Sequence, residues 1–132
     1  MSIAVNALLA ALQQAVKANA GLALLLGSQG LSDRTVRPQR FPALAVGAVE
    51  TRDYSTGEAE GAEILLTLEA WSMVSRREAE GLADAARRIV EAVPEGLGGL
   101  RLVNVRHRRT VSRRDVKAGL FVAEASFRAV VE

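Results

Sequence analysis

The sequence predicts an α+β fold in which two helices pack on one face of a mainly antiparallel four-stranded sheet, in the order α-β-β-α-β-β. Two segments repeat apolar residues at the spacing of an amphipathic helix, and four others alternate apolar and polar residues as half-buried strands do. Short polar connections between consecutive strands favour antiparallel pairing. With 132 residues, 49% of them hydrophobic, the chain is expected to form one domain over residues 1–132.

The first predicted helix lies near the N-terminus, where one stripe carries Val5, Leu8, Leu9, Leu12 and Val16. This apolar run is too short to span a membrane and no basic residue precedes it, so we interpret it as a buried helix rather than a signal peptide. Residues 22–26 are expected to add a short helical turn closed by Gly27. Residues 27–42 are expected to form an irregular loop.

The middle of the chain predicts two strands and a second helix. Residues 43–49 read as a short apolar strand, residues 50–61 as a polar, acidic connection, and residues 62–71 as an alternating strand. A capping box of Ser75 and Glu78 marks the start of the helix. Its apolar stripe comprises Ala79, Leu82, Ala83, Ala86, Ile89, Val90 and Val93.

The last quarter of the chain predicts two further strands. The first is expected to leave the core as a basic arm over residues 100–117. In the second, polar residues occupy one face and the core face carries Phe121, Ala123, Ala125, Phe127, Ala129 and Val131.

Charge is divided unevenly along the sequence. Residues 1–100 carry a net charge of −3 and residues 101–132 a net charge of +5, which gives the overall +2. Such a split points to an acidic partner, either a nucleic acid or the acidic face of another copy. Acidic residues in the 50–63 segment and basic residues in the arm favour a head-to-tail contact that can close into a ring. The candidate interface or lumen residues are Glu58, Glu60, Glu63, Arg106, Arg108, Arg109, Arg113, Arg114 and Lys117.

A charged sheet edge that prevents aggregation is the alternative explanation for the arm. Six basic residues within positions 106–117 exceed what an edge needs, and we interpret the arm as an interaction surface. No Tyr, Trp or Phe lies between Arg101 and Gly119, so base stacking is not expected. Contact with nucleic acid would then be electrostatic and independent of sequence.

No catalytic, cofactor-binding or metal site is predicted. The sequence has no cysteine and one histidine, which excludes disulfides, thiolate nucleophiles and the common zinc ligand sets. His107, set among arginines, is interpreted as a solvated surface residue. The glycine-rich residues 96–99 follow a helix and precede a strand, the wrong order for a phosphate-binding loop. We therefore expect a protein that is not an enzyme and needs no cofactor.

Short signals in a fixed order cover nearly the whole chain. The most distinctive are Trp71-Ser72 before the second helix and Phe127-Arg128-Ala129 at the end. The others include Leu24-Leu-Leu-Gly27, Phe41-Pro-Ala-Leu-Ala-Val-Gly47, Leu102-Val-Asn-Val105 and Arg113-Arg-Asp115. With these signals the chain resembles the tail-completion or tail-terminator proteins of long-tailed phages and phage-derived gene transfer agents.

The resemblance implies a single tail-terminator-like domain and a virion structural protein without enzymatic activity. Six copies would form a ring at the head-proximal end of the tail tube, stop tube polymerisation, join the tail to the neck and let DNA pass. The implied partners are further copies of the chain, the major tail tube protein, a neck or head-completion protein and DNA bound without sequence preference, with no membrane. The implied location is the tail of a virion or phage-like particle assembled in the bacterial cytoplasm. The alternative is a small, sequence-nonspecific nucleic-acid-binding module that uses the basic arm over residues 101–117.

Overall fold

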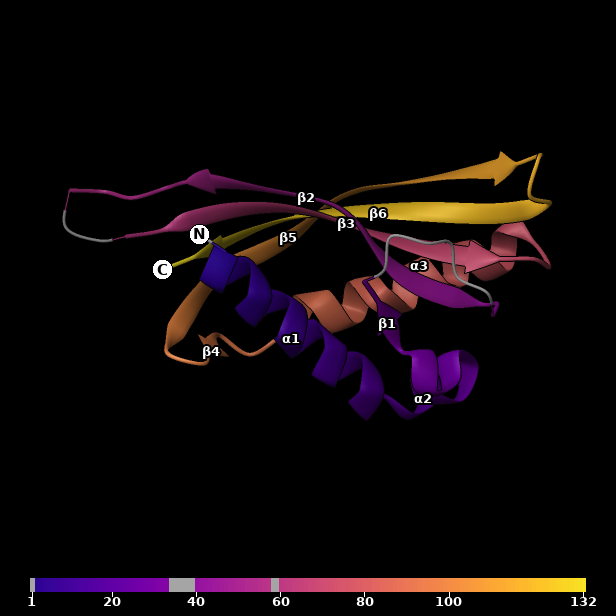
Figure 1. The fold of residues 1–132 in the computed structure, drawn as a ribbon, viewed down its shortest axis with the longest axis horizontal. Helices are drawn as coiled ribbons and strands as arrows, with labels where there is room; N and C mark the ends of the chain where they lie inside the picture. Colours follow the sequence, from indigo (N-terminus) through magenta and orange to yellow (C-terminus); the bar gives the residue numbers. More distant parts are fainter. Residues whose placement is uncertain (1, 34–39, 58–59) are drawn as a thin grey trace.

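The computed structural model describes residues 2–33, 40–57 and 60–132, and over these ranges it contains one curled, mixed sheet of six strands and three α-helices. The helices lie together on one side of the sheet (Figure 1). They are α1 (Ser2–Ala18), α2 (Ala20–Leu26) and α3 (Arg76–Glu91), and a 3₁₀ turn, η1 (Gly27–Gln29), follows α2. The strands are β1 (Leu31–Ser32), β2 (Ala43–Asp53), β3 (Ala62–Ser72), β4 (Gly96–Leu97), β5 (Leu100–Asp115) and β6 (Leu120–Val131).

The predicted four-stranded sheet with two helices is wrong. The sheet has the order β1-β2-β3-β6-β5-β4, and it is mixed because Leu31 and Ser32 of β1 pair parallel with β2. Strands β1 and β4 have two residues each, too few to show alternation in the sequence. The expected helical turn at residues 22–26 is confirmed as α2, and the amide of Gly27, at φ 63°, donates to the carbonyl of Ala23.

The hydrophobic core fills the space between the helices and the inner face of the sheet. The stripes of α1 and α3 meet alternate residues of β3 and β6, including Ile64, Leu66 and Phe127, which are at most 2% exposed. The predicted core face of β6 is therefore confirmed. A second, smaller cluster lies on the opposite face of the sheet and comprises Ala43, Ala45, Trp71, Leu120 and Val122.

The start of α3 is held by two serines. The Ser75 hydroxyl accepts a hydrogen bond from the Glu78 amide at 3.0 Å, as the capping box predicts. The Glu78 carboxylate does not reach back to the Ser75 amide; it accepts from the hydroxyl of Ser72 at 2.7 Å. Ser72 is fully buried and accepts in turn from the amides of Val74 and Ser75. Ser72, part of the Trp71-Ser72 signal, therefore stabilises the connection between the end of β3 and the start of α3.

Replacing Ser75 with Ala is expected to lower the free energy of unfolding by about 1 kcal/mol, because one amide at the start of α3 loses its acceptor. Chemical denaturation monitored by circular dichroism measures this loss. Ser28 offers the control for a serine-to-alanine change, because it is exposed and its hydroxyl has no hydrogen bond to a described residue. Equal stability of Ser75→Ala and Ser28→Ala would contradict the capping role.

Candidate subunit and nucleic-acid interface

The predicted basic arm is a strand of the sheet. β5 runs 16 residues and pairs antiparallel with β6 from Leu102 to Asp115, so the expectation that it leaves the core is wrong. Its register shifts twice, between Leu102 and Asn104 and between His107 and Arg109. Such bulges insert an unpaired residue and disturb the alternation of side chains, so the sequence predicts the strand but not which of its residues face the core.

The acidic segment is shorter than predicted, because β2 continues to Asp53 and only the residues after it form the connection. Glu60 is exposed there, whereas Glu58 lies outside the described residues. The carboxylate of Glu63 accepts a hydrogen bond from Arg128 at 2.6 Å, and its side chain is only 15% exposed. Glu63 therefore has a partner within its own subunit, and Glu60 is the described acidic candidate for an intermolecular contact.

We call the connection between β2 and β3 the acidic turn and the connection between β5 and β6, which carries Lys117, the basic turn. The two turns lie at opposite ends of the sheet (Figure 1). The pairing of β3 with β6 sets Ala62 beside Val131 at one end and Ser72 beside Phe121 at the other. β3 has 11 residues, and at about 3.3 Å per residue it separates the two ends by roughly 33 Å. At that distance exposed charges are screened from one another at physiological salt. Charges at the two ends can therefore pair directly only between different copies.

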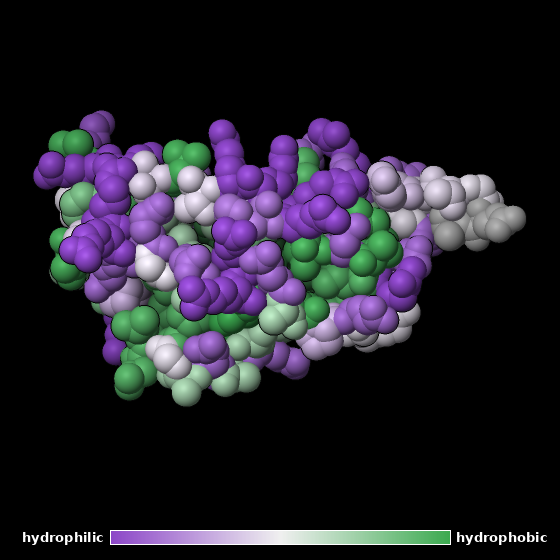
Figure 2. All heavy atoms as spheres, turned by 180° about the vertical axis from the view of Figure 1, so that it is seen from behind, coloured by the Kyte–Doolittle hydropathy of each residue, from purple (hydrophilic) through white to green (hydrophobic). Residues whose placement is uncertain are grey.

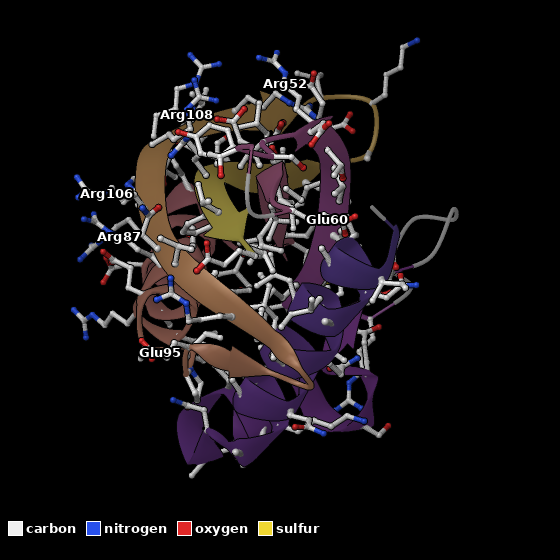
Figure 3. The ribbon with its side chains drawn as sticks, turned by 90° about the vertical axis from the view of Figure 1, so that its left-hand side faces the viewer. Arg52, Glu60, Arg87, Glu95, Arg106 and Arg108 are labelled. Atoms are coloured by element: carbon white, nitrogen blue, oxygen red, sulfur yellow. The ribbon has the colours of Figure 1, made fainter. Side chains whose placement is uncertain are left out.

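Three arginines in the middle of β5 form an exposed basic patch. Arg106 pairs with Arg128 and Arg109 with Ser126 across the sheet, on the face opposite the helices, and Arg108 is at the bulge. None of the three has an ion pair with a described residue. Arg108, Arg109 and Ser126 line a shallow hollow of about 310 Å³. Figure 3 shows Arg106 and Arg108 pointing outward from the β5 margin, and Figure 2 shows hydrophilic side chains projecting from the back of the molecule.

The basic residues nearer the β5–β6 turn have partners in their own subunit. Arg113 forms an ion pair with Glu124 at 3.1 Å, and the guanidinium of Arg114 lies 5.9 Å from the ring centre of Phe121. Lys117 is exposed in the turn itself. The eight described residues of the nine predicted thus lie in three places within one subunit: Glu60 and Glu63 at the acidic end of the sheet, Arg106, Arg108 and Arg109 in the arginine patch, and Arg113, Arg114 and Lys117 near the β5–β6 turn.

His107 is not the solvated residue that the sequence suggested. Its side chain is partly buried, with its ring 5.5 Å from that of Phe127 in an edge-on arrangement. Its Nε2 atom lies 2.7 Å from the hydroxyl of Thr110. His107 is therefore a packing residue at the margin of the core.

Arg128, which the sequence analysis named only within the Phe127-Arg128-Ala129 signal, links the strands at the base of the acidic turn. Its hydrogen bond to Glu63 raises the pKa of the Arg128 guanidinium, which also lies 5.5 Å from the ring centre of Tyr54. Nearby, hydrogen bonds from the Ser55 hydroxyl and amide lower the pKa of the Asp53 carboxyl. These contacts join β2, β3 and β6 and order the base of the acidic turn.

The described part of the chain holds no group of three or more metal-ligating side chains that could bind an ion. Among the same residues, no single helix is long and apolar enough to cross a membrane; α1 and α2 with η1 reach that length and composition only as a pair bent by 92°. Of these two helices, α1 buries its apolar stripe in the hydrophobic core.

The profile of the tail completion protein gp17 family matches residues 10–132, and the chain belongs to this family. A chain of the virion of a native gene transfer agent particle has a similar structure, with 28% sequence identity and a TM-score of 0.70; the match covers 93% of this chain and 92% of that one. A search of curated proteins found no match. The chain is therefore a structural component of a phage-type tail.

Proposed function

We propose that this tail completion protein is the terminator of the tail: six copies form a ring at the head-proximal end of the tube, stop its polymerisation, join it to the neck and leave a passage for DNA. Its role in the particle is structural and requires no catalysis. The partners in this proposal are further copies of the chain, the tail tube protein below the ring and a neck or head-completion protein above it.

The observation that carries the proposal is the separation of opposite charges at the two ends of the sheet. A ring of identical subunits needs two different, complementary surfaces on each copy. Glu60 is exposed at one end and Lys117 at the other, and roughly 33 Å of strand lies between the ends. An exposed ion pair contributes about 0–1 kcal/mol to the stability of a contact, so such pairs stabilise a ring appreciably only because every subunit boundary repeats them.

The exposed arginine patch of β5 supports the DNA-related part of the proposal. Arg106, Arg108 and Arg109 have no carboxylate partner among the described residues, so they are available to phosphates. The same observation favours the second candidate function, a sequence-nonspecific nucleic-acid-binding module. The two functions differ in what the isolated chain does, because a module must hold DNA by itself and a passage must let it slide.

Reversing Glu58 and Glu60 to Lys is expected to keep the protein out of the ring while leaving the monomer folded. Glu60 is exposed, so reversing its charge does not disturb the core, and Glu58 belongs to the same acidic stretch of the sequence. Tails assembled with this variant should lack the protein and vary in length, because nothing stops the tube. Electron microscopy gives the length distribution, and mass spectrometry of purified tails gives the protein content.

Asp84→Lys with Glu95→Lys is the matched control, since both residues are exposed and lie in and just after α3, away from the acidic turn. This control should assemble with normal tail lengths. Normal tails from the Glu58 and Glu60 reversal would rule out the acidic turn as a subunit interface.

A further inference from the structure

We propose that neighbouring copies join edge to edge: the outer edge of β5 on one copy pairs antiparallel with the outer edge of β2 on the next. The inference rests on the proposed ring, and it places the subunit boundary at the sheet edges instead of at the acidic and basic turns, because edge pairing in register keeps these two turns at opposite ends of the ring. It makes the curled sheets of the separate copies one continuous sheet around the ring.

Both outer edges have backbone groups available for pairing. β4 pairs only with Leu100 and Arg101, and the Arg76 guanidinium donates to the Ser112 carbonyl at 3.0 Å, so the outer edge of β5 is without a described partner from 104 to 111. β1 pairs only with Leu44 and Ala45, and no described residue pairs with the outer edge of β2 from 46 to 53. Seen along the strands, β5 (orange) and β2 (purple) form opposite margins of the curled sheet (Figure 3). An unpaired edge of this length is a template for another strand.

The strand directions allow the two edges to pair. β2 is antiparallel to β3, β3 to β6 and β6 to β5, so β2 and β5 of one copy run in opposite directions. Rotation about a ring axis brings β2 of the next copy beside β5 without reversing its direction along that axis. The new pair is then antiparallel, like the three pairs within the subunit. The same relation repeats at each boundary, which is the head-to-tail contact that closes a ring.

The irregularities of the two edges lie at the same level of the sheet. The shift in β2 falls between Val46 and Val49, opposite Thr67 of β3, and Thr67 pairs with Ser126 of β6. The shift in β5 falls between His107 and Arg109, beside the same Ser126. If the two edges pair without a shift, the bulge of β2 therefore lies opposite the bulge of β5, and the residues on either side of the bulges can pair regularly.

Charge selects β2 over another copy of β5 as the partner. Glu50 pairs with Leu65 on the face opposite the helices, the face that also carries Arg106 and Arg109. Its ion pair with Arg52 at 3.2 Å is exposed and therefore weak, unlike the part-buried pair of Glu63, so Glu50 can exchange it for an arginine of the next copy. When the two edges pair without a shift, Glu50 lies opposite Arg106. The next shift that keeps every side chain on its own face of the sheet places Glu50 opposite Arg109. Two β5 edges would instead place arginines against arginines. The charges and bulge that discourage pairing of β5 with itself thus leave β2 as the suitable partner.

Cysteine pairs test this contact cleanly, because the sequence contains no cysteine. Opposed residues of an antiparallel pair have Cα atoms about 4.5–5.5 Å apart, within the range of a disulfide. Particles assembled with Glu50→Cys and Arg106→Cys in one chain, or with Glu50→Cys and Arg109→Cys, are oxidised mildly and run on a non-reducing gel. We expect one of the two pairs to shift most of the chain into linked multimers. Glu50→Cys with Arg88→Cys on α3 is the control and should remain monomeric on the gel.

The edge pairing and the proposed ring fail in different ways. Protein found in purified tails in fixed amount, with no cross-link from either cysteine pair, would overturn the edge pairing and leave the ring standing. Wild-type protein absent from purified tails would overturn the proposed function itself. Charge exchange gives an independent readout: Glu50→Arg should block incorporation, and adding Arg106→Glu and Arg109→Glu to that variant should restore it. Incorporation of Glu50→Arg at the wild-type level would also contradict the edge pairing.

Discussion

Replacing Phe127 with Ala is expected to lower the free energy of unfolding by about 3–5 kcal/mol, because it removes a ring from a closely packed core and leaves a cavity. Phe127 is 1% exposed and is among the largest fully buried side chains of the described chain. Its neighbours come from separate elements, with Leu66 opposite it on β3 and His107 opposite it on β5. A loss of this size removes much of the stability of an ordinary domain.

The measurement is equilibrium denaturation in urea, with the midpoint and slope compared between variant and wild type. Phe121→Ala is the matched control, since Phe121 lies on the same strand and is only partly buried. The control should lose clearly less stability than Phe127→Ala. A cooperative Phe127→Ala transition at the wild-type midpoint would show that this ring is not the centre of the core.

The sequence predicted the regular elements well because their side chains obey a period. β3 and β6 alternate over most of their length, and the stripe of α3 recurs at helical spacing, so most of the burial could be assigned from the sequence. β5 could not be predicted in this way. Its bulge near Arg108 breaks the alternation, and the residues facing the core beyond it are Thr110 and Ser112, which have no apolar signature. This part of β5 is stabilised by backbone pairing with β6, and backbone pairing leaves no periodic pattern of apolar side chains in the sequence.

The candidate site was predicted in outline and misjudged in detail for a similar reason. Sequence shows which residues carry charge, but not which charges neutralise one another across strands. Glu63 and Arg128 are 65 positions apart, and adjacent strands bring them to 2.6 Å. Arg101 and Glu132 meet in the same way at the ends of β5 and β6. What remains unpaired on β5 after these contacts, the patch of Arg106, Arg108 and Arg109, is visible only once the register is known.

Replacing Arg108, Arg109, Arg113 and Arg114 with Ser is expected to impair tail assembly or DNA delivery while the chain still folds. All four residues are exposed, and the one ion pair lost, between Arg113 and Glu124, is of the surface kind worth about 0–1 kcal/mol. If the ring surrounds moving DNA, its arginines must attract phosphate without holding it. The isolated wild-type chain should then bind duplex DNA at about 10⁻⁴–10⁻⁶ M or more weakly, without sequence preference.

A titration against random and selected duplexes at near-physiological salt measures this affinity, and repetition at several salt concentrations gives the number of phosphate contacts. The four-serine variant should bind more weakly, with a shallower salt dependence. A control with the same change in charge but located away from β5 and the β2 edge replaces Lys17, Arg40, Arg77 and Arg88 with Ser, and its DNA delivery should stay close to that of the wild type. Nanomolar, sequence-selective binding by the isolated chain would contradict a sliding passage, because DNA held that tightly could not move through the ring, and it would favour the nucleic-acid-binding module instead.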